Sequence, residues 1–313
     1  MRKALLLYNP RSGRRRHRRL EDVQSVLHVL QNAGVNASAA ATVAPGPAIE
    51  QVQQGIADGC DTVFACGGDG TVHDVLQGLV GTHTALGIIP LGTANVFTHD
   101  LGLPSSLVAA AQAALQAKSL RIAVGRIDYQ DFQGQSASRY FTITAGIGAD
   151  AYLFHRLDMN AKQTLGLAAY YAKATHVWLT HKMQFFQVNY QEDGQRRSAK
   201  TTQLLAVRIA DFGDGLRKLA PGASLLRDDL RLVLFQTRNR WAFLRYVARG
   251  LLGVNWRVRG IDLAYSEEAA CAQSDPAEPK IFVEADGELL GTLPAKISIV
   301  RDAVTILVPQ SFR

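Results

Sequence analysis

The sequence predicts an α/β domain with a parallel sheet, followed by a mainly antiparallel β-sandwich domain. In the first third of the 313 residues, short apolar segments alternate with stretches whose apolar residues recur at helical spacing. This pattern is typical of β-α units that build a parallel sheet covered by helices on both faces. From about Arg121 the chain consists of β-rich segments separated by turns, as expected of a sandwich or barrel. We place the domains at 1–122 and 123–300 with an active-site cleft between them, and 301–313 as a tail that could return to the first domain.

The elements of the first domain follow from apolar runs and from helical spacing. Residues 3–8 form an apolar run that stops at Asn9-Pro10, as a buried strand does. The first two helical patterns are each followed by a glycine, Gly34 and Gly59, where a C-terminal cap belongs. Strands are expected at 3–8, 35–42, 62–66 and 85–89, and helices at 14–32, 47–58, 72–79 and 105–116.

The second domain is expected to be built from short β segments. Strands are predicted at 139–144, 183–190, 203–209, 230–236, 280–284 and 304–308, with a turn at Glu192-Asp193-Gly194. One helical stretch, 165–180, interrupts them. Residues 241–256 also carry large apolar side chains, at Phe243, Tyr246, Val247, Leu251 and Leu252. Packing in the core is the default for both stretches, and an acyl-chain pocket or a membrane interface is the alternative.

The composition favours a cytoplasmic protein that meets phosphate. No apolar run approaches the roughly 18 residues of a membrane span, and we see no signal peptide. Cys60, Cys66 and Cys271 are odd in number and lack CxxC spacing, which argues against a disulfide framework or a thiolate zinc site.

The net charge is +7, and six arginines fall within residues 11–19. Such a cluster attracts phosphate on nucleotide, lipid or nucleic acid. At an anionic membrane each basic residue contributes about 1 kcal/mol, so peripheral binding to the inner face of the membrane is one reading and a solvated helix start is the other. Nucleic acid is the least favoured partner, because no aromatic stacking platform lies beside the cluster.

The strongest chemical signal is Gly67-Gly68-Asp69-Gly70-Thr71, which lies between an expected strand and an expected helix. Glycines allow the backbone to approach an anion closely, and a helix N-terminus supplies N–H groups and positive potential. Two further segments, Asn9 to Gly13 with Ser12 and Gly92 to Asn95, also follow strands. Because ligands bind at the carboxyl ends of parallel strands, the three segments together predict a phosphate site.

Far along the chain, Glu284-Ala285-Asp286-Gly287-Glu288 places three carboxylates at a strand end and turn. An ordinary acidic β-turn is the plain interpretation, since Asp-Gly is common there. Phosphoryl transfer to an alcohol, however, requires a carboxylate that accepts the hydroxyl proton and acidic groups that organise Mg²⁺. We therefore consider this turn a candidate catalytic segment.

These motifs resemble, in their order and spacing, those of the diacylglycerol kinase catalytic family, and most of all its bacterial soluble lipid kinase branch. NAD kinases share only the Gly-Gly-Asp-Gly element. The resemblance implies an NAD kinase/diacylglycerol kinase-like fold, ATP as phosphoryl donor and a lipid hydroxyl of diacylglycerol, ceramide or a related amphiphile as acceptor. It implies Asp69 at the phosphates through Mg²⁺ and Asp286 as the base, with Glu288 as its competitor. The nucleotide contacts that we expect are Asn9, Ser12, Thr42, Gly67, Gly68, Asp69, Gly70, Thr71, Val72, His73, Gly92, Thr93 and Asn95.

The resemblance also suggests a structural cation, Mg²⁺ or Ca²⁺, at the carbonyls of Leu225 and Leu230 and the carboxylate of Asp228. Oxygen ligands of this kind suit a hard cation; an acidic turn between strands is the alternative. The chain departs from the family pattern at Val96, where an aspartate is frequent, and at Asp229, where a glycine is usual. These departures put metal stoichiometry and substrate choice in question. A kinase of a soluble dinucleotide such as NAD and a non-catalytic lipid or nucleotide sensor stay open as alternatives, and a homodimer is left open as the oligomeric state.

Overall fold

The computed structural model describes two compact units. It covers residues 1–10, 18–43, 48–149, 151–152, 182–213, 219–254, 256–273, 275 and 278–312. The expected helix at 165–180, Ser12, and four of the six arginines in the cluster lie outside the described residues. Unit 1 is Met1–Val124 with Asp211–Gly213 and Val300–Arg313; unit 2 is Gly125–Ala210 with Asp214–Ile299.

Unit 1 is built on a parallel sheet with the strand order β15-β4-β3-β1-β2. Its strands are β1 (Lys3–Tyr8), β2 (Asn36–Ala41), β3 (Thr62–Gly67), β4 (Ala85–Pro90) and the last part of β15 (Glu288–Val308). Every pair in this sheet is parallel. All residues of β3 and β4 are buried, because central parallel strands are covered on both faces, which explains their continuous apolar sequence.

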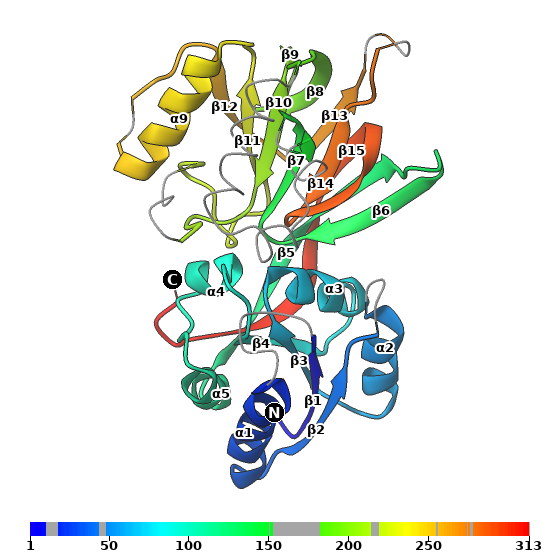
Figure 1. The fold of residues 1–313 in the computed structure, drawn as a ribbon, viewed down its shortest axis with the longest axis vertical. Helices are drawn as coiled ribbons and strands as arrows, with labels where there is room; N and C mark the ends of the chain where they lie inside the picture. Colours follow the sequence, from blue (N-terminus) through cyan, green and yellow to red (C-terminus); the bar gives the residue numbers. More distant parts are fainter. Residues whose placement is uncertain are drawn as a thin grey trace. The chain divides into compact units, whose positions relative to one another are not determined.

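Two pairs of helices cover this sheet. The helices are α1 (Arg19–Asn32), α2 (Ile49–Ala57), α3 (Asp69–Leu79), α4 (Val96–Asp100) and α5 (Leu107–Leu115). α1 packs against α5 and α2 against α3, and Figure 1 shows the two pairs on opposite sides of the strands. Gly78 lets α3 approach α2 closely, since a Cβ there would lie 2.7 Å from Val52 Cβ.

Unit 2 is a sandwich of antiparallel strands. Its strands are β5 (Lys118–Gln130), β6 (Ser136–Phe141), β7 (Thr144–Gly148), β8 (Phe186–Glu192), β9 (Gln195–Thr201), β10 (Gln203–Val207), β11 (Leu230–Phe235), β12 (Ile261–Ser266), β13 (Glu268–Ala272), β14 (Phe282–Ala285) and β15, with one helix among the described residues, α9 (Arg240–Leu252). One layer has the order β12-β11-β10-β7-β14-β15, and a second runs from β15 through β13 and β8 to β9. One buried cluster draws on both layers, for example on Leu232 of β11 and Val188 of β8.

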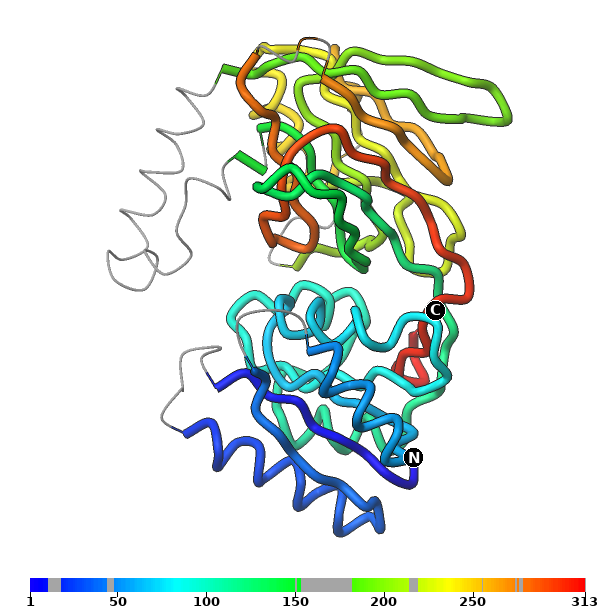
Figure 2. Tube along the Cα trace, turned by 90° about the vertical axis from the view of Figure 1, so that its right-hand side faces the viewer, coloured from blue at the N-terminus to red at the C-terminus, as the bar shows by residue number. Residues whose placement is uncertain are grey.

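Two strands belong to both units. The chain leaves unit 1 within β5 and returns within β15. β5 pairs with β15, and Figure 2 shows the two segments running side by side, β5 in green and β15 in red. β15 then pairs with β4 at Thr305 and Ile306. The chain also passes through unit 1 at Asp211–Gly213.

The predicted fold class is confirmed, with differences in individual elements. Residues 139–144, expected as one strand, are divided between β6 and β7. The short helix α4 and the helix α9 were not predicted as helices. The turn at Asp193-Gly194 joins β8 to β9 as expected, with both residues at positive φ (50° and 75°), the geometry of a two-residue hairpin turn. Among the helices that the structure describes, none is long and apolar enough to cross a membrane.

Candidate active site

The expected nucleotide-binding segments meet at the carboxyl edge of the unit 1 sheet. The parallel register aligns the ends of β1, β2, β3 and β4. Backbone hydrogen bonds then connect the residues just beyond these ends: Asn9 N donates to Cys66 O (3.3 Å), Thr42 N to Tyr8 O (2.9 Å) and Leu91 N to Gly67 O (2.8 Å). The structure thus brings the three sequence segments together along one edge.

This edge contains the point at which the direction of the chain reverses. β1 lies between β2 and β3. The crossover through α1 therefore places β2 on one side of β1. The crossover through α2 returns the chain to the other side of β1, where β3 and β4 follow. Ligands of open parallel sheets bind outside the carboxyl ends of the strands at such a switch point. Asn9 follows β1 and Gly67 ends β3, so the two residues flank it.

The glycine turn after β3 leaves no room for side chains. A Cβ on Gly67 would lie 2.1 Å from Thr71 Oγ1, and Thr71 is buried in α3. Gly68 is the N-cap of α3 and Asp69 is its first residue. The first N–H groups of a helix cannot be bonded within the helix, and their positive potential favours an anion.

The loops after β3 and β4 touch backbone to backbone. A Cβ on Gly92 would lie 2.4 Å from Gly68 Cα, and one on Gly68 would lie 3.2 Å from Gly92 Cα. Both loops therefore require glycine at the point of contact. The result is a surface of main-chain groups next to a helix N-terminus, which is the arrangement that proteins use to hold phosphate.

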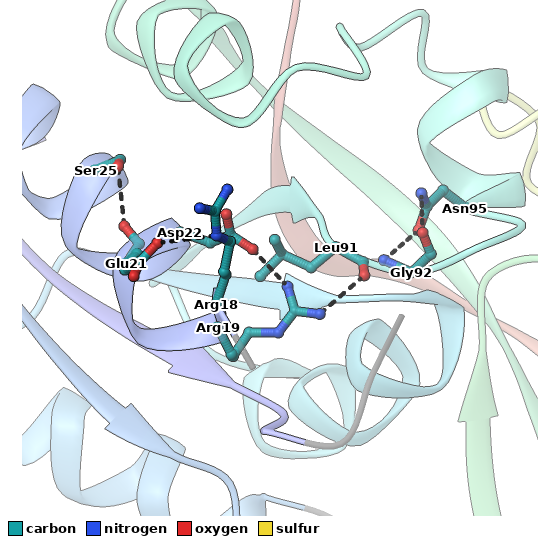
Figure 3. A network of polar contacts seen from close by, with 8 residues as sticks. All are labelled: Arg18, Arg19, Glu21, Asp22, Ser25, Leu91, Gly92 and Asn95. Carbon is teal, nitrogen blue, oxygen red and sulfur yellow. Dashed lines mark hydrogen bonds and ion pairs between the residues drawn. The ribbon is translucent and has the colours of Figure 1, made fainter. Parts of the chain in front are cut away.

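Asn95 holds the loop after β4 in shape. Its Oδ1 accepts from Gly92 N and its Nδ2 donates to Gly92 O, both at 3.1 Å, as Figure 3 shows. Asn95 adopts the left-handed conformation (φ 49°) as the N-cap of α4, a conformation that asparagine tolerates better than most residues. Its side chain thus has a structural partner in this structure.

The carboxylate of Asp69 binds the start of α4. Its Oδ2 accepts from Val96 N and its Oδ1 from Phe97 N, both at 3.1 Å. Asp69 therefore joins α3 to α4 across the edge of the sheet. A carboxylate is also the kind of group that holds Mg²⁺ or its waters. Val96, where the family frequently has an aspartate, contributes its backbone N–H to this contact. The nearby carboxylate of Asp100 accepts from Asp211 N at 2.8 Å.

The structure divides the expected nucleotide contacts into two groups. The side chains of Thr71, Val72 and His73 are buried, each at most 3% exposed, and Gly67 is buried as well. Ser12 lies outside the described residues. The residues that stay partly or fully exposed are Asn9, Thr42, Gly68, Asp69, Gly70, Gly92, Thr93 and Asn95.

Arg19, the last residue of the arginine cluster, lies in the interior, which sequence reasoning did not predict. Arg19 is 4% exposed. Its guanidinium lies 3.5 Å from Leu91 O and 3.5 Å from Asp22 Oδ2 (Figure 3). Burial lowers the pKa of Arg19, while the Asp22 carboxylate raises it. Arg19 thus contacts the loop after β4 from the interior of the fold. The cluster therefore presents fewer charges to a membrane than its sequence suggests.

In unit 2, the carboxylate of Asp286 is held by backbone amides. Asp286 and Gly287 form a two-residue turn between β14 and β15, with φ of 48° and 83°. Asp286 is 8% exposed. Its carboxylate accepts from the N–H groups of Thr142 (3.0 Å), Ile143 (2.9 Å) and Thr144 (3.0 Å), and the Thr142 hydroxyl lies 3.4 Å away. These donors lie where the chain breaks between β6 and β7.

The two glutamates of the same turn differ in environment. Glu284 is 1% exposed, and its Oε2 accepts from Gly287 N at 2.9 Å. Glu288 is exposed. Of the three carboxylates, Glu288 is therefore the one that solvent reaches.

The turn suggested as a cation site contains an arginine. Arg208 is completely buried and donates to the carbonyls of Arg227 (2.6 Å), Asp229 (2.7 Å) and Leu225 (3.1 Å). Burial lowers the pKa of Arg208 to about 10, while the carboxylates of Asp229 and Asp228 raise it, so the guanidinium keeps its charge at neutral pH. The Leu225 carbonyl, an expected metal ligand, has a donor within the protein.

The two aspartates of this turn differ in their surroundings. Asp229 pairs with Arg227 at 2.5 Å, and Asp228 is exposed. Within the ranges that the structure covers, no three His, Cys, Asp or Glu side chains gather to hold a metal ion. The Arg208 guanidinium already places a positive charge against the carbonyls of this turn.

Two sequence-family models match the chain. The diacylglycerol kinase catalytic domain matches residues 3–127, and the YegS C-terminal NAD kinase beta sandwich-like domain matches residues 142–308. Among curated proteins, the chain is similar to the diacylglycerol kinase of Bacillus subtilis (strain 168), at 27% identity over 99% of this chain and 97% of the relative. The diacylglycerol kinase of Staphylococcus carnosus (strain TM300) is 25% identical over 99% and 96%.

Solved structures show the same fold. A putative diacylglycerol kinase from Bacillus anthracis str. Sterne superposes with a TM-score of 0.75 at 21% identity, over 99% of this chain and 97% of that one. Yeast NADH kinase complexed with NADH superposes with a TM-score of 0.51 at 10% identity, over 99% and 84%. These two likenesses concern the fold alone.

Proposed function

Because the chain belongs to the diacylglycerol kinase family, whose members are kinases with an alcohol acceptor, we propose that it transfers the γ-phosphate of ATP to a lipid hydroxyl at a membrane surface. Diacylglycerol is the first candidate acceptor; ceramide and related amphiphiles are the next. The observation that carries the proposal is the contact of Gly68 and Gly92. It leaves a main-chain cradle at the edge of the sheet where a triphosphate would bind.

In this proposal unit 1 binds the nucleotide. The backbone of Gly68 to Gly70 and of Gly92 to Thr93 holds the phosphates, while Asn9 and Thr42 contribute polar groups from the neighbouring strand ends. Catalysis of phosphoryl transfer consists mainly of such positioning and of charge stabilisation. A rigid cradle that is already shaped by glycine contacts serves both needs.

A divalent metal ion, Mg²⁺ in our proposal, accompanies the nucleotide and neutralises charge on its phosphates. Asp69 is the residue that would hold the ion or its waters, because its carboxylate lies at the start of α3, next to the loops that meet at Gly68 and Gly92. We assign no ion to the Leu225, Asp228 and Leu230 set, since Arg208 occupies that turn.

Unit 2 supplies the acceptor of the hydroxyl proton. Four donors surround the carboxylate of Asp286, which fills its acceptor positions. In this arrangement Asp286 fixes the turn, and Glu288, which is exposed at the start of β15, is the better placed of our two candidates for the base. General-base help is worth about 10²–10⁴ in rate.

Two variants separate these roles. Glu288→Gln keeps the fold and is expected to lose turnover by about 10²–10⁴-fold if Glu288 is the base. Asp286→Asn places an amide N–H₂ against backbone donors and is expected to lower both turnover and thermal stability. A Glu288→Gln enzyme with near-normal turnover, beside a stable but inactive Asp286→Asn enzyme, would return the base role to Asp286.

The reaction itself is tested with purified protein, radiolabelled ATP, Mg²⁺ and a panel of lipids in mixed micelles, followed by chromatography of the products. A labelled lipid phosphate supports the proposal, and the panel identifies the acceptor. Phosphorylation of NAD without lipid would replace the lipid kinase by a dinucleotide kinase. Lipid binding without ATP consumption would indicate a sensor.

A further inference from the structure

The outer face of α9 is apolar where a surface helix is normally polar. Five side chains on it are at least 42% exposed: Trp241 (73%), Leu252 (67%), Leu251 (54%), Leu244 (45%) and Val247 (42%). A soluble surface helix carries its apolar stripe toward the core and polar residues outside. α9 is apolar on both sides, so its outer face has the composition of a surface that is covered by something else.

The inner face of α9 is fixed to unit 2. The ring of Phe243 stacks on Phe235 of β11 with centroids 4.4 Å apart, and Tyr246 meets Phe235 edge to face at 5.2 Å. Tyr246 Oη also donates to Leu219 O at 2.5 Å, and the Arg249 guanidinium lies 4.2 Å from the Tyr246 ring centre. These contacts decide which face of the helix points outward.

Both ends of the helix are capped. Asn239 Oδ1 accepts from Trp241 N at 3.0 Å, and Gly253 adopts the left-handed conformation at the C-cap (φ 65°). Figure 1 shows α9 at the margin of unit 2, beside β12 and β11. The helix is therefore formed before any partner binds, and a partner need not order it.

The charged residues of this segment are of one sign. Residues 236–260 contain six arginines and no aspartate or glutamate. Arg245, Arg257 and Arg259 are exposed, and Arg240 lies at the start of the helix. Trp241 is the second residue of α9, and Trp256 (38% exposed) follows the C-cap in the sequence. Exposed leucines, tryptophans and arginines together are the composition of helices that lie in the surface of an anionic bilayer.

We infer that α9 with Gly253, Val254 and residues 256–259 is a docking surface for an anionic lipid bilayer. The apolar side chains enter the acyl boundary, the tryptophans lie at the headgroup level and the arginines bind lipid phosphates. A protein partner is the less favoured occupant, because an interface core is normally depleted of charged residues while Arg245, Arg257 and Arg259 are exposed in this segment. The inference rests on the proposed function only in placing the acceptor at a membrane.

The test measures binding of the full chain to sedimented vesicles, one set of phosphatidylcholine with phosphatidylglycerol and one of phosphatidylcholine alone. We expect binding to the anionic vesicles, weakened by salt, and a blue shift of tryptophan emission. The double variant Leu251→Glu with Leu252→Glu is expected to lose about tenfold or more in affinity, because each leucine contributes burial worth about a factor of ten. Val108→Glu, on the exposed side of α5 (40% exposed), is the matched control.

The outcomes distinguish this inference from the proposed function. Kinase activity is measured in parallel on a short-chain diacylglycerol dissolved below its micelle concentration, where the double variant should equal the unchanged protein. Equal vesicle binding by the double variant and the unchanged protein would overturn the inference. So would a dimer in solution that the double variant converts to a monomer, since a second copy would then cover the face. Absence of kinase activity with intact, α9-dependent vesicle binding would overturn the proposed function alone.

Discussion

Arg208→Met tests whether a buried guanidinium takes the role that a structural cation would have in unit 2. Arg208 is fully buried and donates to three carbonyls between Leu225 and Asp229. Methionine has a similar length and removes all three donors. The carbonyls of Leu225, Arg227 and Asp229 then lose their guanidinium donor.

The expected loss follows from the three carbonyls. A buried acceptor without a donor costs about 1–3 kcal/mol. Part of the sum is offset, because the variant no longer buries a charge and water can enter, so we expect a net loss of about 3–5 kcal/mol. For a unit of this size a loss of 1 kcal/mol lowers Tm by about 2–4 °C, which gives a shift of about 10 °C.

The assay is thermal unfolding followed by circular dichroism, with EDTA and with added Mg²⁺ or Ca²⁺. The unchanged protein should show the same Tm in all three conditions, because it needs no ion at this turn. Arg208→Lys should lose an intermediate amount, since an ammonium is a point charge that cannot span three acceptors as a guanidinium does. In Arg208→Ala, the freed carbonyls and the Asp228 carboxylate should make Tm rise with Ca²⁺.

Two results would refute this reasoning. A clear loss of Tm on adding EDTA to the unchanged protein would show that a metal ion holds the turn beside Arg208. An Arg208→Met protein with unchanged Tm would show that the three hydrogen bonds contribute nothing measurable.

Three more predictions concern unit 1 and the thiols. Gly92→Ala would place a Cβ 2.4 Å from Gly68 Cα, so we expect weaker binding of a fluorescent ATP analogue and a loss of about 1–3 kcal/mol in stability, while Ala94→Ser in the same loop should be neutral; normal ATP binding would contradict the cradle. Asp69→Asn removes one acceptor from the start of α4, so we expect about 1 kcal/mol less stability and a Mg²⁺ titration of activity displaced to higher concentration; an unchanged titration would remove Asp69 from the metal site. Burial raises the pKa of all three thiols, Cys60, Cys66 and Cys271, so the folded protein should react slowly with a disulfide reagent at pH 8, and all three thiols should react only after unfolding. Rapid reaction of the folded protein would contradict the burial.

Most elements of unit 1 could be predicted because they are specified locally, and α4 is the exception. β1 has the predicted bounds, and β3 ends where Gly67 allows the backbone to meet Thr71. The three edge segments could also be placed together in advance, since parallel strands align their carboxyl ends. What could not be predicted was the contact between Gly68 and Gly92, because it depends on two loops that come from different β-α units.

The break between β6 and β7 shows the limit of local patterns. Residues 139–144 have the composition of one strand, but the N–H groups of Thr142 and Ile143 turn toward Asp286. Their partner lies far along the chain, so nothing nearby in the sequence signals the break. α4 has the same origin, since a helix of this length depends on the Asp69 carboxylate at its start.

Buried charges were the other source of error. Arg19 occurs in a run of arginines and Arg208 at the end of an apolar strand pattern, and both are inside the fold. A sequence pattern treats an arginine as a surface residue, whereas carbonyls from distant turns supply the partners that burial requires. For α9, the expected core packing holds for Phe243 and Tyr246 and fails for Val247, Leu251 and Leu252, because periodicity alone does not say which side of an apolar helix meets the protein.

The return of β15 to unit 1 has a consequence for synthesis on the ribosome. β4 is the edge strand of a four-stranded sheet until Thr305 and Ile306 pair with Ala85 and Leu86. In the nascent chain, β4 therefore stays an unpaired edge strand while the whole of the sandwich is translated. An unpaired margin invites pairing with other chains. A fragment that stops near residue 127 should therefore aggregate, and supplying residues 300–312 as a separate peptide should restore its solubility.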